Sequence, residues 1–340
     1  MQPAEALERI AYLLDRAREE PYRVRAYLRA AETVKALTPD ELVARLATGT
    51  LTELDGIGPK TAAIITEVAA SGSTAYLDKL EEETALAEGK GSELVAQLKG
   101  DLHTHSLWSD GGAEIDVMAR AARDLGHEYI ALTDHSPRLT VANGLSRERL
   151  LRQLEVIAAL NDQLAPFRIL TGIEVDILED GTLDQDDEIL AQLDVVVASV
   201  HSKLRMEKRA MTRRMITAIA NPHTDVLGHC TGRYVVGRGR PQSEFEAEVV
   251  FRACERFDTA VEINSRPERL DPPNDLLELA VEIGCRFAIN TDAHAPGQLE
   301  WQSYGADKAF ETRVAIDRVV NSWSTDKLLE WTQRSSSRTK

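Results

Sequence analysis

Cysteine, aromatic residues and long apolar runs are all scarce in this 340-residue chain. The three cysteines, Cys230, Cys254 and Cys285, are too few and too scattered for a disulfide framework, which favours a reducing compartment. No run of about 18 apolar residues occurs in the sequence, so we expect no membrane-spanning helix. The charged, amphipathic N-terminus lacks the apolar core of a signal peptide. The sequence therefore predicts a cytoplasmic protein that does not bind a membrane.

Acidic residues outnumber basic ones, 56 to 40, which gives a formal net charge of −16. A strongly negative chain is a poor candidate for bulk binding to nucleic acid. Basic residues are nevertheless concentrated locally, with six bases and three acids in residues 16–35, and six bases and one acid in residues 203–214. Each of these stretches is either a solvated helix face or a local site for a polyanion.

The first 80 residues have the pattern of a small all-α domain. Apolar positions recur at helical spacing over residues 4–20, 24–37 and 39–47. The sequence Leu-Asp-Gly-Ile-Gly-Pro-Lys at 54–60 then predicts a tight glycine turn between two helices. A polar, glycine-containing stretch follows, and we interpret residues 81–99 as a linker.

From residue 100 to 332, short apolar runs alternate with helical segments. Six of these runs predict β-strands: 128–133, 168–175, 194–200, 224–229, 259–264 and 285–291. Repeated strand–helix units are typical of a parallel sheet, and six or seven units in about 230 residues favour a closed barrel over an open sheet. We expect residues 333–340, which are rich in serine, to form a disordered tail.

Histidine is concentrated at the predicted strand ends, where six of the eight histidines lie in short polar motifs. The C-terminal ends of parallel strands converge on one face of a barrel, so these motifs would meet there. The candidate metal ligands are His103, His105, Asp110, His135, Glu174, His201, His229, Asp292 and His294. A lone histidine at a strand end is more often a hydrogen-bonded core or rim residue, but the recurrence at successive strands favours metal binding.

Nine ligands exceed what one ion can use, so the sequence predicts a cluster of two or three divalent ions. His103 and His105 are two positions apart on extended backbone, so both imidazoles would reach one ion. Imidazole and carboxylate ligands suit Zn, Mn or Fe, whereas a thiolate-rich structural zinc site is not expected.

Seven motifs along the chain resemble those of a known family. In order they are H-x-H-x(3)-S-D-G, T-D-H-S, G-x-E-V-D, S-V-H-S, N-P-H-x-D-x-L-G-H-x-T-G-R, E-I-N-x-x-P-x-R-L-D and N-T-D-A-H. This ordered set resembles the PHP domain, named for polymerases and histidinol phosphatases, and most closely the one at the C-terminus of bacterial family X DNA polymerases. The resemblance implies an α/β fold, a distorted (β/α)7 TIM-like barrel, over residues 100–332.

The resemblance also implies a three-metal centre. His103, His105, Glu174 and Asp292 would hold the first ion. Glu174 would bridge to a second ion, held by His201 and His229. Asp110, His135 and His294 would hold the third.

Residues 1–80 resemble the small helix-hairpin-helix DNA-binding domain of family X polymerases, through residues 19–31 and 49–62. The turn formed by Gly56, Ile57 and Gly58 would present backbone N–H groups to a DNA phosphate. Lys60, Arg23 and Arg25 would add positive charge. The alternative is that this segment is a plain helical packing unit without a DNA contact.

The chain also departs from the family X pattern. Only about twenty residues separate the two modules, so the polymerase palm and its catalytic aspartates are absent, and we do not expect DNA polymerisation. Ile64 occupies the place where that family often has a Schiff-base lysine, which argues against lyase activity. Cys230 stands where a proline is common, and it is either an oxidation-sensitive thiol or a small buried filler.

The predicted activity is metal-dependent hydrolysis of phosphate esters. A hydroxide bridging two ions about 4 Å apart would attack phosphorus. Arg233 and Arg269 either bind the phosphate or form structural ion pairs, and Lys203 is a candidate for the rim. The favoured substrate is DNA, as a 3′–5′ exonuclease, 3′-phosphatase or abasic-site endonuclease in repair. The alternatives are a small-molecule phosphomonoesterase such as a histidinol phosphatase, and a non-catalytic scaffold that binds DNA ends; the oligomeric state is left open.

Overall fold

The computed structural model describes residues 1–336, and the chain divides into two units. The first unit comprises Met1–Ala87 together with Pro296–Gln298, and the second comprises the rest. Helices make up the first unit: α1 Pro3–Arg16, α2 Pro21–Lys35, α3 Pro39–Thr48, η1 Leu51–Glu53, α4 Pro59–Ser71 and α5 Ala75–Thr84. Its core forms because α1 presents Leu7, Ile10, Leu13 and Leu14 at helical spacing, and all four are fully buried.

The turn between η1 and α4 depends on glycine. Gly56 has a φ of +79°, and a Cβ built there would lie 2.7 Å from Cγ of Arg29. A side chain at this position would therefore be strained and would collide with α2. Gly58 then serves as the N-cap of α4, and Pro59 occupies the first helical position, where its missing N–H costs nothing.

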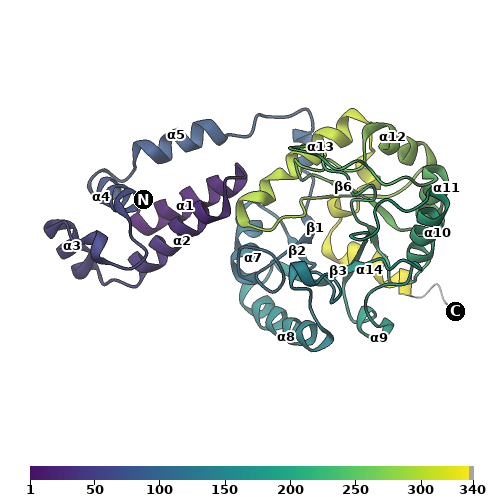
Figure 1. Ribbon diagram of the computed structural model, residues 1–340, viewed down its shortest axis with the longest axis horizontal. Helices are drawn as coiled ribbons and strands as arrows, with labels where there is room; N and C mark the ends of the chain where they lie inside the picture. The colour runs from purple at the N-terminus through teal and green to yellow at the C-terminus, as the bar shows by residue number, and fades with distance from the viewer. Residues whose placement is uncertain (337–340) are drawn as a thin grey trace. The chain divides into compact units, whose positions relative to one another are not determined.

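Seven parallel strands form the centre of the second unit (Figure 1). They are β1 Gly100–Thr104, β2 Tyr129–Leu132, β3 Arg168–Asp176, β4 Val195–Ser199, β5 Val226–Leu227, β6 Ala260–Asn264 and β7 Phe287–Asn290. The strands hydrogen-bond to one another in sequence order, and a parallel bridge between Thr104 and Ala293 nearly closes the ring. The predicted (β/α)7 barrel and the preceding helical domain are thus confirmed.

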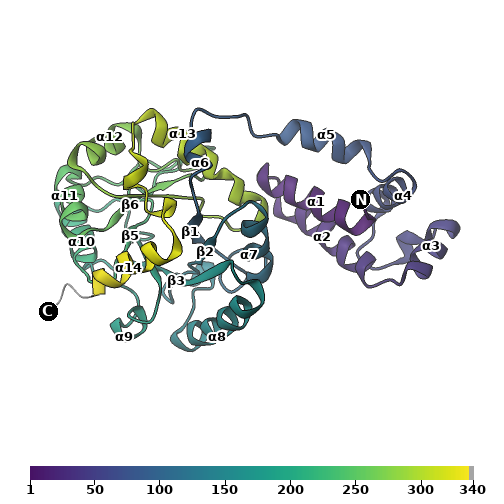
Figure 2. The ribbon, with the colours of Figure 1, turned by 180° about the vertical axis from the view of Figure 1, so that it is seen from behind.

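Helices surround this ring of strands in both ribbon views (Figures 1 and 2). They are α6 Ser92–Val95, α7 Ile115–Asp124, α8 Arg147–Leu164, α9 Asp187–Leu190, α10 Lys208–Ile219, α11 Ala247–Phe257, α12 Asn274–Ile283, α13 Gln302–Glu311 and α14 Thr325–Ser336. Short 3₁₀ segments lie at η2 Thr140–Ala142, η3 Pro296–Trp301, η4 Ile316–Arg318 and η5 Val320–Ser322. None of the helices in the described part of the chain has the length and apolarity needed to cross a membrane.

Alternation along each strand separates two apolar layers. On β4, Val195 and Val197 belong to the cluster inside the barrel, whereas Val196 packs outward under the helices. Trp323, which follows η5, and Trp331 in α14 complete the inner cluster. Figure 2 shows α14 at one end of the ring, and Leu328 and Trp331 of this helix are buried in the inner cluster.

The observed boundaries differ from the predicted ones at two places. The first unit extends to Ala87 and α6 belongs to the second, so the expected linker, 81–99, is divided between the units. Residues 333–336 of the expected tail are helical, because they continue α14. Residues 337–340 of that tail lie outside the described residues.

Candidate metal centre

The barrel brings together all nine predicted ligands. Each lies within or after the C-terminal part of a strand, and their donor atoms fall into overlapping groups in which every atom is within 4.8 Å of the others. The groups are His105–Asp110–His135–His294, His103–Glu174–His229, His103–His105–Asp292 and His135–Glu174–His201. Because the groups share members, the geometry brings the ligands into one cluster, and their assignment to individual ions stays a prediction.

Glu174 lies at the middle of this cluster. Its Oε1 is 3.2 Å from Nε2 of His201 and 2.9 Å from Nε2 of His229. Its Oε2 is 3.4 Å from Nε2 of His103 and 2.9 Å from Nδ1 of His135. The carboxylate therefore faces histidines on both of its oxygens, as a bridging ligand would.

Two further carboxylates face the histidines from either side of Glu174. Asp110 Oδ1 lies 3.5 Å from Nε2 of His135 and 3.4 Å from Nε2 of His294. Asp292 Oδ1 lies 3.4 Å from Nε2 of His105. Asp292 has a φ of +55°, so the chain turns sharply after β7 at this residue.

Several buried imidazole nitrogens have no hydrogen-bond partner in the part of the chain that the structure describes. Within the cluster they are Nε2 of His103, both ring nitrogens of His105 and Nδ1 of His229. An unpaired buried polar atom is costly, so such a concentration of them needs an explanation. Lone pairs that converge on carboxylates fit divalent cations, and the absence of thiolates fits Zn, Mn or Fe.

The charge balance of the site leads to the same interpretation. Burial raises the pKa of Glu174, but the charges of His201, His103 and His135 outweigh this and hold it well below its usual value. Burial lowers the pKa of His135, yet Glu174 and Asp110 raise it to about 10. Protons on His103, His135 and His201, whose pKa values are raised, thus balance the buried carboxylates, a charge that bound cations would supply instead.

Two carboxylates that we did not predict as site residues orient the histidines. Glu262 Oε1 accepts a hydrogen bond from Nδ1 of His103 at 2.7 Å, and Asp176 Oδ1 accepts one from Nδ1 of His201 at 2.9 Å. Each bond fixes the tautomer that leaves Nε2 free to bind a metal. The signal in the sequence was an acidic residue inside an apolar strand, in T-A-V-E-I-N and G-I-E-V-D.

The cluster opens into a cavity of about 320 Å³. One part of its lining is cationic, with Arg240, Arg266 and Arg269 near Tyr234. Another part is apolar, with Leu139, Val141 and Ala142 from η2 and the residue before it. The metal-ligand candidates are therefore accessible from a mouth that offers both positive charge and apolar surface.

Comparison with known proteins identifies the two units. The family model described as PHP domain matches residues 101–266, and the model described as helix-hairpin-helix domain matches residues 1–74. A probable phosphatase of Thermoanaerobacter sp. (strain X514) is 32% identical over 206 residues, covering 57% of this chain and 78% of that protein. The chain belongs to the PHP domain family.

A second relative is longer than this chain. The DNA polymerase/3′-5′ exonuclease PolX of Bacillus subtilis is 43% identical over 230 residues, covering 68% of this chain. The chain spans 40% of that relative's length. Among solved structures, the histidinol phosphate phosphatase of Lactococcus lactis has a TM-score of 0.42 at 20% identity, covering 63% of this chain and 92% of that one. At the level of reaction class, the predicted metal-dependent phosphoester hydrolase is confirmed.

Of the three predicted basic residues, only Arg269 is among those that line the PHP cavity. Arg269 lines it, is 8% exposed, and its Nε lies 3.3 Å from Asp292. Arg233 is not among the lining residues, because its guanidinium donates to the carbonyl oxygens of Arg269 and Leu270. Lys203 is exposed and faces Glu179 at 3.9 Å. We therefore retain Arg269 as the candidate for binding phosphate and correct the placement of Arg233. Lys203, predicted at the rim, is not among the residues that line the cavity.

Cys230 is a buried filler in the PHP domain. Its side chain is 5% exposed, and burial, then the charge of Asp271, raises the pKa of its thiol well above the usual value. A thiol of this kind is protonated and poorly reactive.

The helix-hairpin-helix domain presents fewer free groups than its sequence suggested. Ile57 is buried and donates its N–H to the carbonyl oxygen of Leu54 at 3.2 Å. Gly58 donates its N–H to Oγ1 of Thr61 at 3.0 Å. Both hairpin amides are thus used internally, so a DNA phosphate would rely on Gly56, on the first turn of α4 and on nearby side chains.

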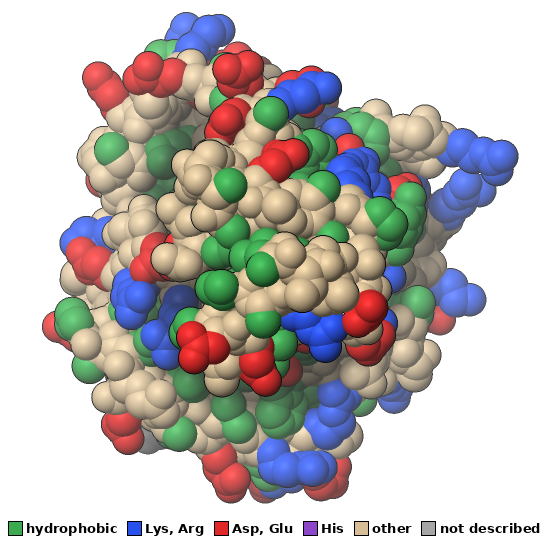
Figure 3. Space-filling model, turned by 90° about the vertical axis from the view of Figure 1, so that its left-hand side faces the viewer, with side chains coloured by type: hydrophobic (Ala, Val, Ile, Leu, Met, Phe, Trp, Pro, Cys, Tyr) green, Lys and Arg blue, Asp and Glu red, His purple; other side chains and the backbone are tan. Residues whose placement is uncertain are grey.

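Among those side chains, Lys60 is exposed, and its Nζ lies 4.0 Å from the centre of the Tyr76 ring. Arg25 is exposed, whereas Arg23 is paired with Glu19. Tyr27 is a core residue, 4% exposed and stacked on Tyr76. On the face drawn in Figure 3, Lys and Arg side chains are interspersed with Asp and Glu side chains, so this face does not present a field of one sign.

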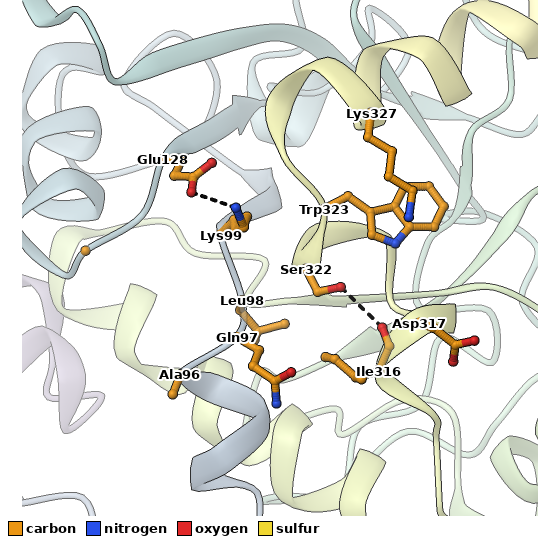
Figure 4. A pocket seen from close by; sticks show the side chains of 11 residues that line it. Ala96, Gln97, Leu98, Lys99, Glu128, Ile316, Asp317, Ser322, Trp323 and Lys327 are labelled. Carbon is orange, nitrogen blue, oxygen red and sulfur yellow. Dashed lines mark hydrogen bonds and ion pairs between the residues drawn. The ribbon is translucent and has the colours of Figure 1, made fainter.

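A second cavity, of about 480 Å³, lies at the opposite end of the barrel (Figure 4). Lys99 and Glu128, which directly precede β1 and β2, form an ion pair across it at 2.8 Å. Lys327 lies over the ring of Trp323 at 4.1 Å. Its basic side chains already have partners, and none of the nine ligand candidates lines it, so it is not the candidate active site.

Proposed function

We propose that the chain hydrolyses phosphodiester bonds at DNA ends, and that 3′–5′ exonuclease activity is the best-supported form. The observation that carries the proposal is the presence, in one chain, of a nine-ligand PHP centre with a cationic mouth and a helix-hairpin-helix domain. The name of the Bacillus subtilis relative, which includes 3′-5′ exonuclease, supports the same assignment.

The proposed first step is binding of the scissile phosphate by arginine. Arg269 lines the cavity, and its buried Nη1 has no hydrogen-bond partner in the described part of the chain, whereas its Nε lies 3.3 Å from Asp292. Arg266 lines the cavity too, and its Nη1 lies 3.7 Å from Oδ1 of Asp292. Guanidinium groups donate hydrogen bonds in a fork that matches phosphate oxygens, so these two residues would orient the ester at the metal ligands.

The proposed ligands are the nine side chains that converge on the cavity. Bound divalent ions would supply a water molecule of lowered pKa and would neutralise charge on the phosphoryl oxygens. Glu262 and Asp176 would hold His103 and His201 in the tautomer that binds metal.

DNA contact is assigned to the helix-hairpin-helix domain. Gly56, the N-terminus of α4 and Lys60 would contact backbone phosphate, with Arg25 adding charge. Such contacts carry no sequence information, so we expect binding that depends on salt and not on base sequence.

A small-molecule phosphomonoesterase is the second candidate, because several relatives of the PHP domain are named probable phosphatases. A non-catalytic end-binding scaffold is the third. The complete set of nine converging donors argues against the scaffold, because a protein that only binds DNA has no need of them.

The test is hydrolysis of a 5′-labelled duplex with a recessed 3′ end, in Mn²⁺ or Zn²⁺, with histidinol phosphate as a parallel substrate. His103→Ala removes a ligand candidate, and His223→Ala is the matched control because His223 belongs to none of the ligand groups. We expect wild type and His223→Ala to shorten the DNA, and His103→Ala to be inactive. Release of phosphate from histidinol phosphate with intact DNA would favour the monoesterase. Metal binding with neither activity would leave only the scaffold.

A further inference from the structure

The segment from Tyr234 to Arg240 forms a small hairpin at the mouth of the PHP cavity. The backbone N–H of Tyr234 donates to the carbonyl of Arg240, and that of Arg240 donates to the carbonyl of Tyr234, both at 2.9 Å. Gly237 and Gly239 have φ values of +61° and +63°, which allows the chain to reverse between these ends. The hairpin therefore has a defined shape, and both of its base residues line the cavity.

Arg240 differs from the two arginines assigned to the scissile phosphate. Arg266 and Arg269 both face Asp292, whereas Arg240 has no carboxylate partner among residues 1–336. Its Nε donates to the carbonyl oxygen of Gly232 at 2.6 Å, and its guanidinium lies 4.5 Å from the centre of the Tyr234 ring. Burial, then the charge of Arg269, lowers the pKa of Arg240. Its positive charge is thus held in place and half-buried, and Asp271 attracts it without forming an ion pair with it.

The ring of Tyr234 links the two cationic positions. The guanidinium of Arg269 lies 4.7 Å from the centre of the Tyr234 ring, and that of Arg240 lies 4.5 Å from it. The ring therefore contacts both guanidinium groups. Apolar side chains complete the lining, and one of them, Val141, is 90% exposed. An uncovered valine beside two anion-binding groups fits a ligand in which a sugar or base separates two phosphates.

We infer that Arg240 is a specificity-determining residue that binds the phosphate next to the scissile one, so that the site selects polynucleotides over phosphate esters with a single phosphate. The inference rests on the proposed function and adds a second phosphate subsite to it. Arg269 binds the phosphate being cleaved, Arg240 binds its neighbour in the strand, and Val141 contacts the nucleoside between them. Histidinol phosphate has one phosphate and cannot use the second position.

The test compares two dinucleotides, TpT and pTpT, which differ by the second phosphate alone. A charge-assisted contact at a half-exposed position contributes about tenfold in affinity, so we expect wild type to show a kcat/KM for pTpT about ten times that for TpT. Arg240→Gln should bring this ratio close to one, because it lowers kcat/KM for pTpT far more than kcat/KM for TpT. Arg240→Lys keeps the charge and should retain most of the preference, which separates loss of charge from damage to the hairpin.

A binding measurement gives a second, independent readout. In Ca²⁺, the affinity for a single-stranded oligonucleotide is measured against salt, and Arg240→Gln should reduce the slope of log K against log salt by about 0.7. Arg256→Gln is the matched control. Arg256 lies in the last turn of α11, shortly before the start of β6, so it is at the end of the barrel away from the cavity. Its slope should equal that of wild type.

The outcomes distinguish the two proposals. An Arg240→Gln protein with the wild-type ratio and the wild-type salt slope would overturn the second subsite and leave the nuclease assignment intact. A wild-type protein that cleaves neither dinucleotide nor longer DNA would overturn the proposed function, and the salt slope of Arg240→Gln would then decide whether the hairpin binds a strand at all.

Discussion

Replacing Glu262 with glutamine tests whether the residues behind the ligands determine metal affinity. Glu262 is fully buried, and its two oxygens accept four hydrogen bonds, from Nδ1 of His103 at 2.7 Å, the amide of His229 at 2.6 Å, and the side chains of Asn290 at 2.9 Å and Asn264 at 3.1 Å. A glutamine at this position keeps the volume but has one acceptor oxygen and one NH₂ group. It therefore cannot accept all four bonds.

The expected magnitude follows from the loss of charge and of alignment. A carboxylate hydrogen-bonded to Nδ1 makes Nε2 of His103 a stronger ligand, and changes at such positions cost about 10- to 100-fold in metal affinity. That corresponds to about 1.4 to 2.7 kcal/mol of binding free energy. The stabilisation that saturating metal gives to the folded protein should fall by the same amount, because it depends on the logarithm of the dissociation constant.

The assay is competition with a chelator of known affinity, followed by measurement of bound Zn and Mn in wild type and Glu262→Gln. Melting temperatures with and without metal accompany it, so that a general loss of stability is seen in both conditions and a loss of metal affinity only in their difference. Glu128→Gln is the control, since it removes a carboxylate from the exposed pair with Lys99 at the other end of the barrel.

Equal metal affinities for Glu262→Gln and wild type, in a variant that folds, would refute the reasoning. In that case the bond between Glu262 and His103 would serve packing alone, and the unpaired Nε2 of His103 would need another explanation.

Three further predictions concern other parts of the chain. Arg269→Gln should lower kcat/KM for any phosphate ester by about 100-fold, because it removes a charged donor from the reacting phosphate, and steady-state kinetics would reveal it; an unchanged value would exclude the phosphate role. Burial raises the pKa of Asp15 to about 7, so ionisation of Asp15 destabilises the fold progressively as the pH rises from about 4 to 7. Asp15→Asn should therefore raise the stability in urea unfolding at pH 8, by at most about 4 kcal/mol, and leave it unchanged near pH 4; equal gains at both pH values would contradict this. Gly56→Ala should destabilise the helical unit by about 1 to 3 kcal/mol, because the backbone at this residue is left-handed and Arg29 occupies the space that a Cβ would need. Hydrogen exchange of the α4 amides would show the loss as reduced protection. Protection equal to that of wild type would show that the turn tolerates a side chain.

The strand-borne part of the centre could be predicted because two regularities coincide in the sequence. An apolar run of strand length marks where β2 or β4 lies, and the polar motif after it marks the end of the strand that faces the cavity. In a parallel barrel all such ends meet, so His135 and His201 could be brought together without any knowledge of loop geometry. The same regularity explains why the fold class was predictable before any distance was available.

Residues whose role depends on loop geometry could not be predicted in this way. Arg233 directly follows a ligand motif and was a natural candidate for phosphate, but its guanidinium turns back onto carbonyl oxygens of the β6 loop. Arg240 is seven positions further and reaches the cavity only because the hairpin pairs it with Tyr234. Periodicity carries no information about such a reversal, which depends on two glycines with positive φ.

The metal-ligand candidates and the substrate-binding surface lie in different parts of the fold. Most ligand candidates lie on the strands of the barrel or within a few residues of their ends, so a change there would disturb the barrel as well as the metals. The cationic and apolar parts of the mouth come instead from the η2 segment, the 234–240 hairpin and the loop after β6, which lie outside the sheet. Loops tolerate change far better than packed strands. We therefore propose that the chemistry of phosphate ester cleavage is tied to the barrel, whereas the choice between a polynucleotide and a small ester depends on loop residues such as Val141 and Arg240.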